Sequence, residues 1–171
     1  MDGFFKTYLD IFETVDESIK KERIIPGLIL IYSAIDSFSS LSEISDRKGR
    51  NIFKVWVKKW MLDKYPLPCN EVDLYSARCG LLHQQISKSQ LTENKKAREI
   101  YYVWGNANLE FLKTAIYDTN KKDDVVAVKV EELFWSFRKG MADCMNEIEK
   151  NRDWKEKFDE KANKLFVSVK H

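Results

Sequence analysis

One segment, about residues 26–42, constrains the fold of this chain most strongly, because it is apolar on nearly every side of a helix. It contains the run LILIYSAIDSF, in which Asp36 is the only charged side chain. A helix that is apolar all round is buried inside a bundle and does not lie on its surface. Pro26 suits the first turn of such a helix. The segment therefore predicts a central helix with other helices packed around it.

The rest of the chain has the patterns of a mainly α protein. Helical periodicity is found in residues 2–22, 51–63, 71–87, 131–150 and 154–166. Residues 98–104 and 123–130 favour short strands, so a small β-hairpin near 98–130 fits the sequence, whereas 109–119 suits a helix or a strand. We find no repeat or linker, and expect one domain over residues 1–171, a bundle of about five to six helices.

The sequence favours a cytoplasmic protein with no membrane segment. No run approaches the roughly 20 apolar residues that span a bilayer, and the N-terminal stretch lacks the pattern of a secretory signal. The three cysteines, Cys69, Cys79 and Cys144, are scattered and odd in number. They suit free thiols in a reducing compartment better than a disulfide framework.

Positive charge is concentrated in residues 47–64, which carry seven basic and one acidic side chain. Within this segment we define a basic stripe that consists of Arg47, Arg50, Lys54 and Lys58. The last three of these residues recur every fourth position. The stripe fits a surface that follows RNA phosphates, with binding that falls steeply as salt rises. It equally fits the solvated face of an amphipathic helix.

The segment DLYSARCGLLHQQ, residues 73–85, contains Arg78 and the only interior histidine, His83. Positions five apart differ by about 140° around a helix and about 7.5 Å along it, but an arginine is long enough to reach the histidine's side. Histidine can move a proton near neutral pH, and a guanidinium binds phosphate oxygens bidentately. Together they provide the chemistry that cleavage of a phosphodiester requires.

An arginine, four to six residues and a histidine on a helix of a small α-helical bundle form the signature of HEPN domains. The text LYSARCGLLH, with the helix of Asp36 upstream, resembles this superfamily over roughly residues 20–90. The resemblance implies a HEPN-like bundle and a metal-independent endoribonuclease that needs no cofactor. Arg78 and His83 would be its catalytic pair, and the ribose 2′-hydroxyl of single-stranded RNA would attack the adjacent phosphate to leave a cyclic phosphate.

The resemblance also implies a homodimer in which the two motifs face each other. The number of histidines agrees with a homodimer. The reaction needs a general base and a general acid, but each chain has one interior histidine. A two-fold axis would bring two copies of His83 together. Toxins, defence components and processing factors are all compatible with such an activity, and so is a partner protein that inhibits it.

Two residues near the motif leave an alternative open. Cys79 stands where nucleases of the family usually have a polar residue, often Asn, directly after the arginine. Asp36 is the best candidate partner for Arg78, because a buried carboxylate is costly unless it is paired. It would either orient Arg78 for catalysis or neutralise it in the core. The alternative is a non-catalytic HEPN-like module that dimerises and binds a nucleotide, RNA or a protein.

Other chemistries have less support. The three cysteines lack the close paired spacing of a zinc site, so we expect no bound metal. Cys79 activated by His83 could act as a nucleophile, but its surroundings are too apolar to favour a thiolate. A glycine-rich phosphate loop is absent, which argues against transfer of phosphate from ATP.

Overall fold

The computed structural model describes residues 2–45, 50–84, 89–119, 121 and 123–164. Its elements follow the order α1 (Asp2–Lys20), α2 (Ile24–Ser42), α3 (Arg50–Trp56), the π-helix η1 (Val57–Leu62), α4 (Glu71–Gln84), α5 (Gln90–Glu93), β1 (Glu99–Val103), α6 (Leu109–Asp118), β2 (Val125–Lys129), α7 (Val130–Lys150) and α8 (Arg152–Ala162). The chain is mainly helical with a small β insertion, which confirms the predicted fold class. The helices outnumber the predicted five to six, because 90–93 and 109–118 are helical as well.

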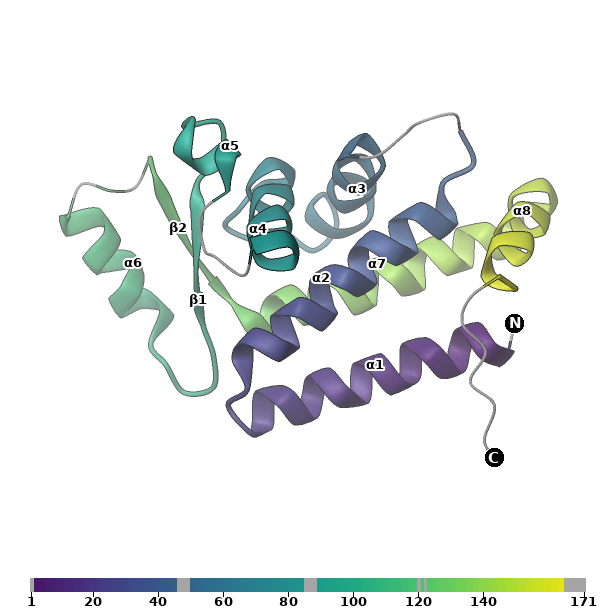
Figure 1. Ribbon diagram of the computed structural model, residues 1–171, viewed down its shortest axis with the longest axis horizontal. Helices are drawn as coiled ribbons and strands as arrows, with labels where there is room; N and C mark the ends of the chain where they lie inside the picture. The colour runs from purple at the N-terminus through teal and green to yellow at the C-terminus, as the bar shows by residue number, and fades with distance from the viewer. Residues whose placement is uncertain (1, 46–49, 85–88, 120, 122, 165–171) are drawn as a thin grey trace.

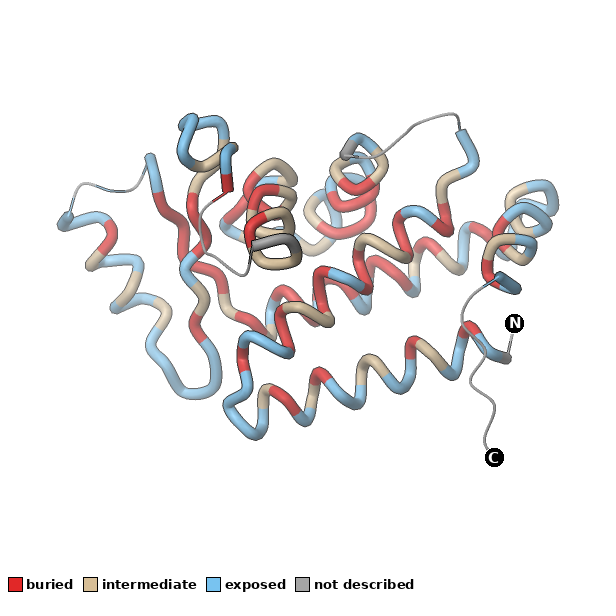
Figure 2. The backbone as a smooth tube through the Cα atoms, viewed as in Figure 1, coloured by how far each residue is buried: buried red, intermediate tan, exposed pale blue. Residues whose placement is uncertain are grey.

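The apolar segment forms α2, which lies at the centre as predicted and packs against α1, α3, α4, α7 and α8 (Figure 1). Its length and hydropathy alone would also allow it to cross a membrane, and half of that stretch is buried inside the fold. Figure 2 shows that buried positions follow α2 and α7, whereas much of α1 and α6 faces solvent.

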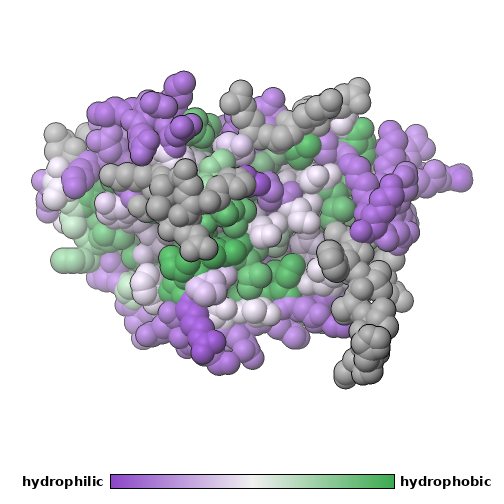
Figure 3. Space-filling view, in the orientation of Figure 1, coloured by the Kyte–Doolittle hydropathy of each residue, from purple (hydrophilic) through white to green (hydrophobic). Residues whose placement is uncertain are grey.

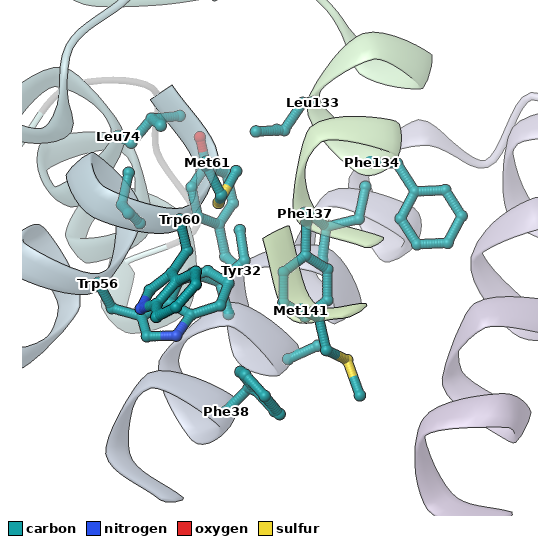
Figure 4. Packing of buried hydrophobic residues seen from close by; sticks show 14 of the residues in the cluster. Tyr32, Phe38, Trp56, Trp60, Met61, Leu74, Leu133, Phe134, Phe137 and Met141 are labelled. Carbon is teal, nitrogen blue, oxygen red and sulfur yellow. The ribbon is translucent and has the colours of Figure 1, made fainter. Parts of the chain in front are cut away.

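Large aromatic side chains from three neighbouring elements fill the core. Figure 4 shows Phe38 of α2, Trp56 of α3 and Phe137 of α7 converging in one cluster. The ring centroids of Phe38 and Trp56 are 5.4 Å apart, and those of Trp56 and Phe137 are 6.0 Å apart, both in edge-to-face geometry. Aromatic pairs prefer such arrangements, so these contacts determine where α3 lies against α2 and α7.

The predicted helix over 51–63 is divided between α3 and η1. The π-helical segment lies against α7 at Gly140, where a Cβ atom would stand 2.6 Å from the carbonyl oxygen of Trp60. Real Cβ atoms do not approach other atoms this closely. The absence of a side chain at Gly140 is therefore what allows η1 and α7 to touch through their backbones.

The β insertion is where the sequence-based prediction was wrong in detail. β1 and β2 are parallel, with Ile100 paired to Val126 and Tyr102 to Val128, so the two strands do not form a hairpin. Parallel neighbours need a crossover connection, and α6 provides it. Asn108 begins α6, because its side chain accepts a hydrogen bond from the backbone N–H of Phe111 at 3.0 Å.

A buried carboxylate joins α4 to Arg98, the residue directly before β1. Asp73 is 1% exposed and accepts hydrogen bonds from the backbone N–H of Arg98 at 2.7 Å and from its Nη2 at 2.7 Å. Asp73 also accepts from the backbone N–H of Asn70, whose own side chain accepts from the N–H of Asp73 at 2.9 Å. This reciprocal pair is a capping box, and it places the start of α4 firmly against the strand.

A second polar contact joins β1 to α2. The hydroxyl groups of Tyr32 in α2 and Tyr102 in β1 form a hydrogen bond in the interior. Burial raises the pKa of both hydroxyls above the ordinary tyrosine value, and both therefore stay protonated. The beginning of α4 is thus held by β1, which is itself tied to α2.

Candidate functional site

Arg78 and Asp36 form the ion pair expected from the sequence. Nη2 of Arg78, on α4, donates to Oδ2 of Asp36, on α2, across a distance of 2.6 Å. The side chain of Arg78 is 17% exposed and that of Asp36 38% exposed, so the pair lies at the edge of the core and reaches solvent through the carboxylate. A half-buried carboxylate on an otherwise apolar helix is therefore compensated by a cation from the neighbouring helix.

The charge of Arg78 is stable in this setting. Burial disfavours the charged form and lowers its pKa, but the Asp36 carboxylate and Cys79 favour the cation, and the net result is a pKa above the ordinary arginine value. A guanidinium is protonated throughout the physiological range in any case. Arg78 therefore acts as a permanent positive charge and cannot serve as an acid or a base.

The pair lines a pocket of about 240 Å³ between three helices. Its walls come from α2, α3 and α4, and the residues that line it are Asp36, Ser39, Ser40, Ile52, Phe53, Tyr75 and Arg78. The pocket combines hydroxyl groups, two charged side chains and two aromatic rings. Such a mixture of apolar walls with a few polar groups is typical of sites for small ligands.

The sequence alone did not identify most of the residues that line the pocket. Ser39, Ser40 and Tyr75 carry hydroxyl groups, and Ile52 and Phe53 are ordinary core residues by their spacing. Tyr75 lies three residues before Arg78, and this spacing places neighbours on one face of a helix. That spacing was the one available signal, and it became meaningful only once Arg78 was known to face α2.

The structure places the second residue of the motif only in part. His83 belongs to the last turn of α4, but its side chain lies outside the described part of the chain. Cys79 is half-buried next to Arg78 on the same helix. It contributes to the raised pKa of Arg78.

The basic stripe is only partly described as well. Arg47 and the side chain of Arg50 lie outside the described residues. Lys54 is half-buried on α3, and Lys58 is exposed on η1. The change from an α-helix to a π-helix between these two lysines alters the regular spacing on which the stripe was predicted. Neither lysine lines the pocket at Arg78.

The three cysteines differ in their surroundings. All are free thiols, Cys69 and Cys144 are buried and Cys79 is half-buried. Burial raises the pKa of Cys69 to about 12 and that of Cys144 to about 11. Within the described residues, no three His, Cys, Asp or Glu side chains come together in a group that could hold a metal ion.

These differences predict selective alkylation. At pH 8 a thiol with a pKa of about 11 is ionised to only about one part in a thousand, and only the thiolate reacts. We expect iodoacetamide to modify Cys79 in the native protein and to leave Cys69 and Cys144 unmodified until denaturant is added. Peptide mass spectrometry after timed quenching would measure this. Equal modification of all three in the native state would contradict the described burial.

Comparison with known proteins identifies no relative. No protein-family model matches the chain, and neither a curated protein nor a solved structure matches it. The fold and the site therefore define the class by themselves: a mainly helical protein with an arginine–aspartate pair on the wall of a small pocket.

Proposed function

We propose that the chain binds RNA at the pocket of Arg78 and Asp36 and cleaves it as a metal-independent endoribonuclease of the HEPN type, acting as a homodimer. The observation that carries the proposal is the position of Arg78. Its guanidinium is held by Asp36 on the wall of an open pocket, on the helix that also contains His83. A cation oriented in this way is suited to a phosphate group.

In this proposal Arg78 binds the scissile phosphate and Asp36 positions it. The N–H donors of a guanidinium are distributed over different edges of one plane, so one edge can bind a carboxylate while another binds a phosphate. The interaction strengthens as negative charge accumulates on the phosphate oxygens in the transition state, and this difference accelerates the reaction. Asp36 is a positioning residue, because it acts through Arg78.

His83 would transfer the protons. One copy takes the proton from the ribose 2′-hydroxyl, whose oxygen then attacks phosphorus. As the bond from phosphorus to the 5′-oxygen breaks, the second copy donates a proton to that oxygen. The products are a 2′,3′-cyclic phosphate and a 5′-hydroxyl end. Each chain supplies one interior histidine, so a homodimer provides both the base and the acid.

The homodimer requires an apolar surface that can be covered. The face drawn in Figure 3 has a hydrophobic area near its centre, over the first half of α2. Ile25, which belongs to the first turn of α2, is an exposed large apolar side chain. A neighbouring groove of about 570 Å³ between α2, β1 and α6 includes Ile25, Tyr101 and Trp104. Exposed apolar areas of this kind are typical of interaction surfaces, and they support association without identifying its partner.

The proposal predicts loss of cleavage when His83 is replaced by Ala. With labelled single-stranded RNA and EDTA present, we expect the wild-type protein to yield cyclic-phosphate ends. We expect His83→Ala to be slower by about 10²–10⁴-fold, the usual contribution of a general acid or base. Arg78→Lys keeps the charge but loses the planar fork, so it should also be strongly impaired.

Circular dichroism must show that both variants are folded as the wild type is. Cleavage that continues unchanged in His83→Ala would contradict the proposed chemistry. Cleavage that requires added Mg²⁺ would contradict its metal independence.

A second candidate is supported by the low exposure of Arg78. At 17% exposure and paired with Asp36, the arginine could serve as a structural bridge in a module that dimerises and binds a nucleotide, RNA or a protein without cleaving it. Cys79, next to it, agrees with this candidate. The outcome that favours it is the absence of cleavage by either protein across varied RNAs, together with a clear loss of stability in Arg78→Ala.

The basic stripe gives a separate prediction about RNA binding. Each phosphate neutralised on a single strand contributes about −0.7 to the slope of log K against log salt concentration. If exposed Lys58 contacts RNA, Lys58→Gln should reduce this slope by about that amount and weaken binding at low salt. Fluorescence anisotropy with a labelled single strand would measure it. Lys113→Gln, on α6 and outside the stripe, is the matched control, and an equal effect there would indicate non-specific attraction only.

A further inference from the structure

The carboxylate of Asp36 uses only one of its two oxygens within the described part of the chain. Oδ2 accepts the hydrogen bond from Arg78, and the Ser39 hydroxyl donates to the backbone oxygen of Asp36. Asp36 also lines the pocket, and 38% of its side chain is exposed. An ionised carboxylate only accepts hydrogen bonds, so the pocket offers an acceptor, Oδ1, to whatever enters it.

Aromatic and apolar side chains form other walls of the pocket. Tyr75 and Phe53 contact each other in edge-to-face geometry, with ring centroids 5.7 Å apart. Phe53 is buried, whereas Tyr75 is half-buried and can be reached from the pocket. Ile52 adds a further apolar contact. The pocket volume of about 240 Å³ is below the roughly 300–1,000 Å³ of sites for drug-sized ligands, which suits a single planar ring system.

We infer that this pocket selects a nucleobase whose Watson–Crick edge carries N–H donors, with guanine preferred. The inference rests on the proposed function and names the substrate class for the same site. Guanine presents its N1–H and amino group side by side, and Oδ1, which has two lone-pair sites, can accept from both. Adenine and cytosine present one amino group. The single N–H of uracil lies between two carbonyl oxygens, and these repel a carboxylate.

The position of Arg78 agrees with this selection. Arg78 and Asp36 are hydrogen-bonded to each other and therefore lie close together. A phosphate that binds the guanidinium and a base that binds the carboxylate can thus belong to one nucleotide. RNA-binding proteins read unstacked bases in this manner, through their Watson–Crick edges and by contact with aromatic side chains. Asp36 would then have two roles, orientation of Arg78 through Oδ2 and recognition of the base through Oδ1.

Binding of the four nucleoside 3′-monophosphates to the whole chain, measured by titration calorimetry, tests the inference. We expect wild-type protein to bind the guanosine nucleotide about 10-fold or more tightly than the uridine nucleotide, with adenosine and cytidine between them. Asp36→Asn keeps the shape of the side chain but replaces an acceptor with a donor. It should reduce the ratio to about twofold or less. Ser33→Ala, on α2 and outside the pocket, is the control and should keep the wild-type ratio.

The wild-type ratio tests the inference even if Asp36→Asn fails to fold. Equal binding of all four nucleotides by the wild type would overturn the base selection, and the proposed function would stand if RNA is still cleaved without preference. Failure of every nucleotide to bind, together with no cleavage, would overturn both. A preference that persists unchanged in folded Asp36→Asn would overturn the role given to Asp36.

Discussion

Replacement of Asp73 by Ala is expected to lower the free energy of unfolding by about 3 kcal/mol. The carboxylate is 1% exposed and receives hydrogen bonds from two backbone N–H groups and from the guanidinium of Arg98. Its removal leaves the two backbone N–H groups without their acceptor, whereas Nη2 of Arg98 keeps the carbonyl oxygen of Pro68. The side chain of Arg98 is 30% exposed, and water can partly solvate it, so we expect the lower end of the range for a broken buried pair.

Urea unfolding followed by circular dichroism would measure this loss. Asp10→Ala is the matched control, because Asp10 pairs with Lys6 on the exposed surface of α1 and surface pairs of this spacing contribute about 0.5 kcal/mol or less. Asp73→Asn separates shape from charge, since the amide keeps one acceptor. If Asp73→Ala were no less stable than Asp10→Ala, the junction between α4 and β1 would not depend on this carboxylate.

Gly140→Ala is the second substitution for which we expect a large effect. The new Cβ atom would lie 2.6 Å from the carbonyl oxygen of Trp60 and 3.0 Å from its carbonyl carbon. Both atoms belong to the backbone of η1, so relief requires α7 and η1 to move apart. Overpacking of a core costs about 1–3 kcal/mol. We expect a loss in this range, even though Ala favours a helix over Gly by up to about 1 kcal/mol.

Gly3→Ala is the control for this substitution. Gly3 also lies in a helix, α1, and a Cβ atom there would meet nothing within 4 Å. It should leave stability unchanged or raise it slightly. Tryptophan fluorescence would report the movement of η1, because Trp60 is buried at the contact with α7. Equal stability of Gly140→Ala and Gly3→Ala would show that the two helices can separate at little cost.

Stability measurements of this kind also separate the two candidate functions. If Arg78 is mainly a structural bridge, Arg78→Ala should lower the free energy of unfolding, as Asp73→Ala does. If Arg78 mainly binds phosphate, the variant should lose nucleotide binding while its stability changes much less. The comparison uses two ion pairs of one chain, with Asp73 as the internal standard for a pair whose carboxylate is almost fully buried.

The pair of Arg78 and Asp36 is the part of the site that could be predicted from the sequence. A lone carboxylate on an apolar helix needs a partner wherever it lies, and the sequence offered few buried cations, so this pair could be predicted across 42 positions. The walls of the pocket could not. Ser39, Phe53 and Tyr75 come from three helices, and only the packing of α3 against α2 and α4 brings them together.

The sequence by itself determined most of the helical segments and the central place of α2, because apolar periodicity is a local property and a helix apolar on all sides needs an apolar environment. It did not determine the helices over 90–93 and 109–118. It did indicate the two strands. Only the tertiary structure decided that these strands are parallel, because the direction of pairing depends on the path of the chain between them, which here includes α6. It likewise decided the π-helical turn at Trp60, since that turn lies where η1 meets the bare backbone of Gly140.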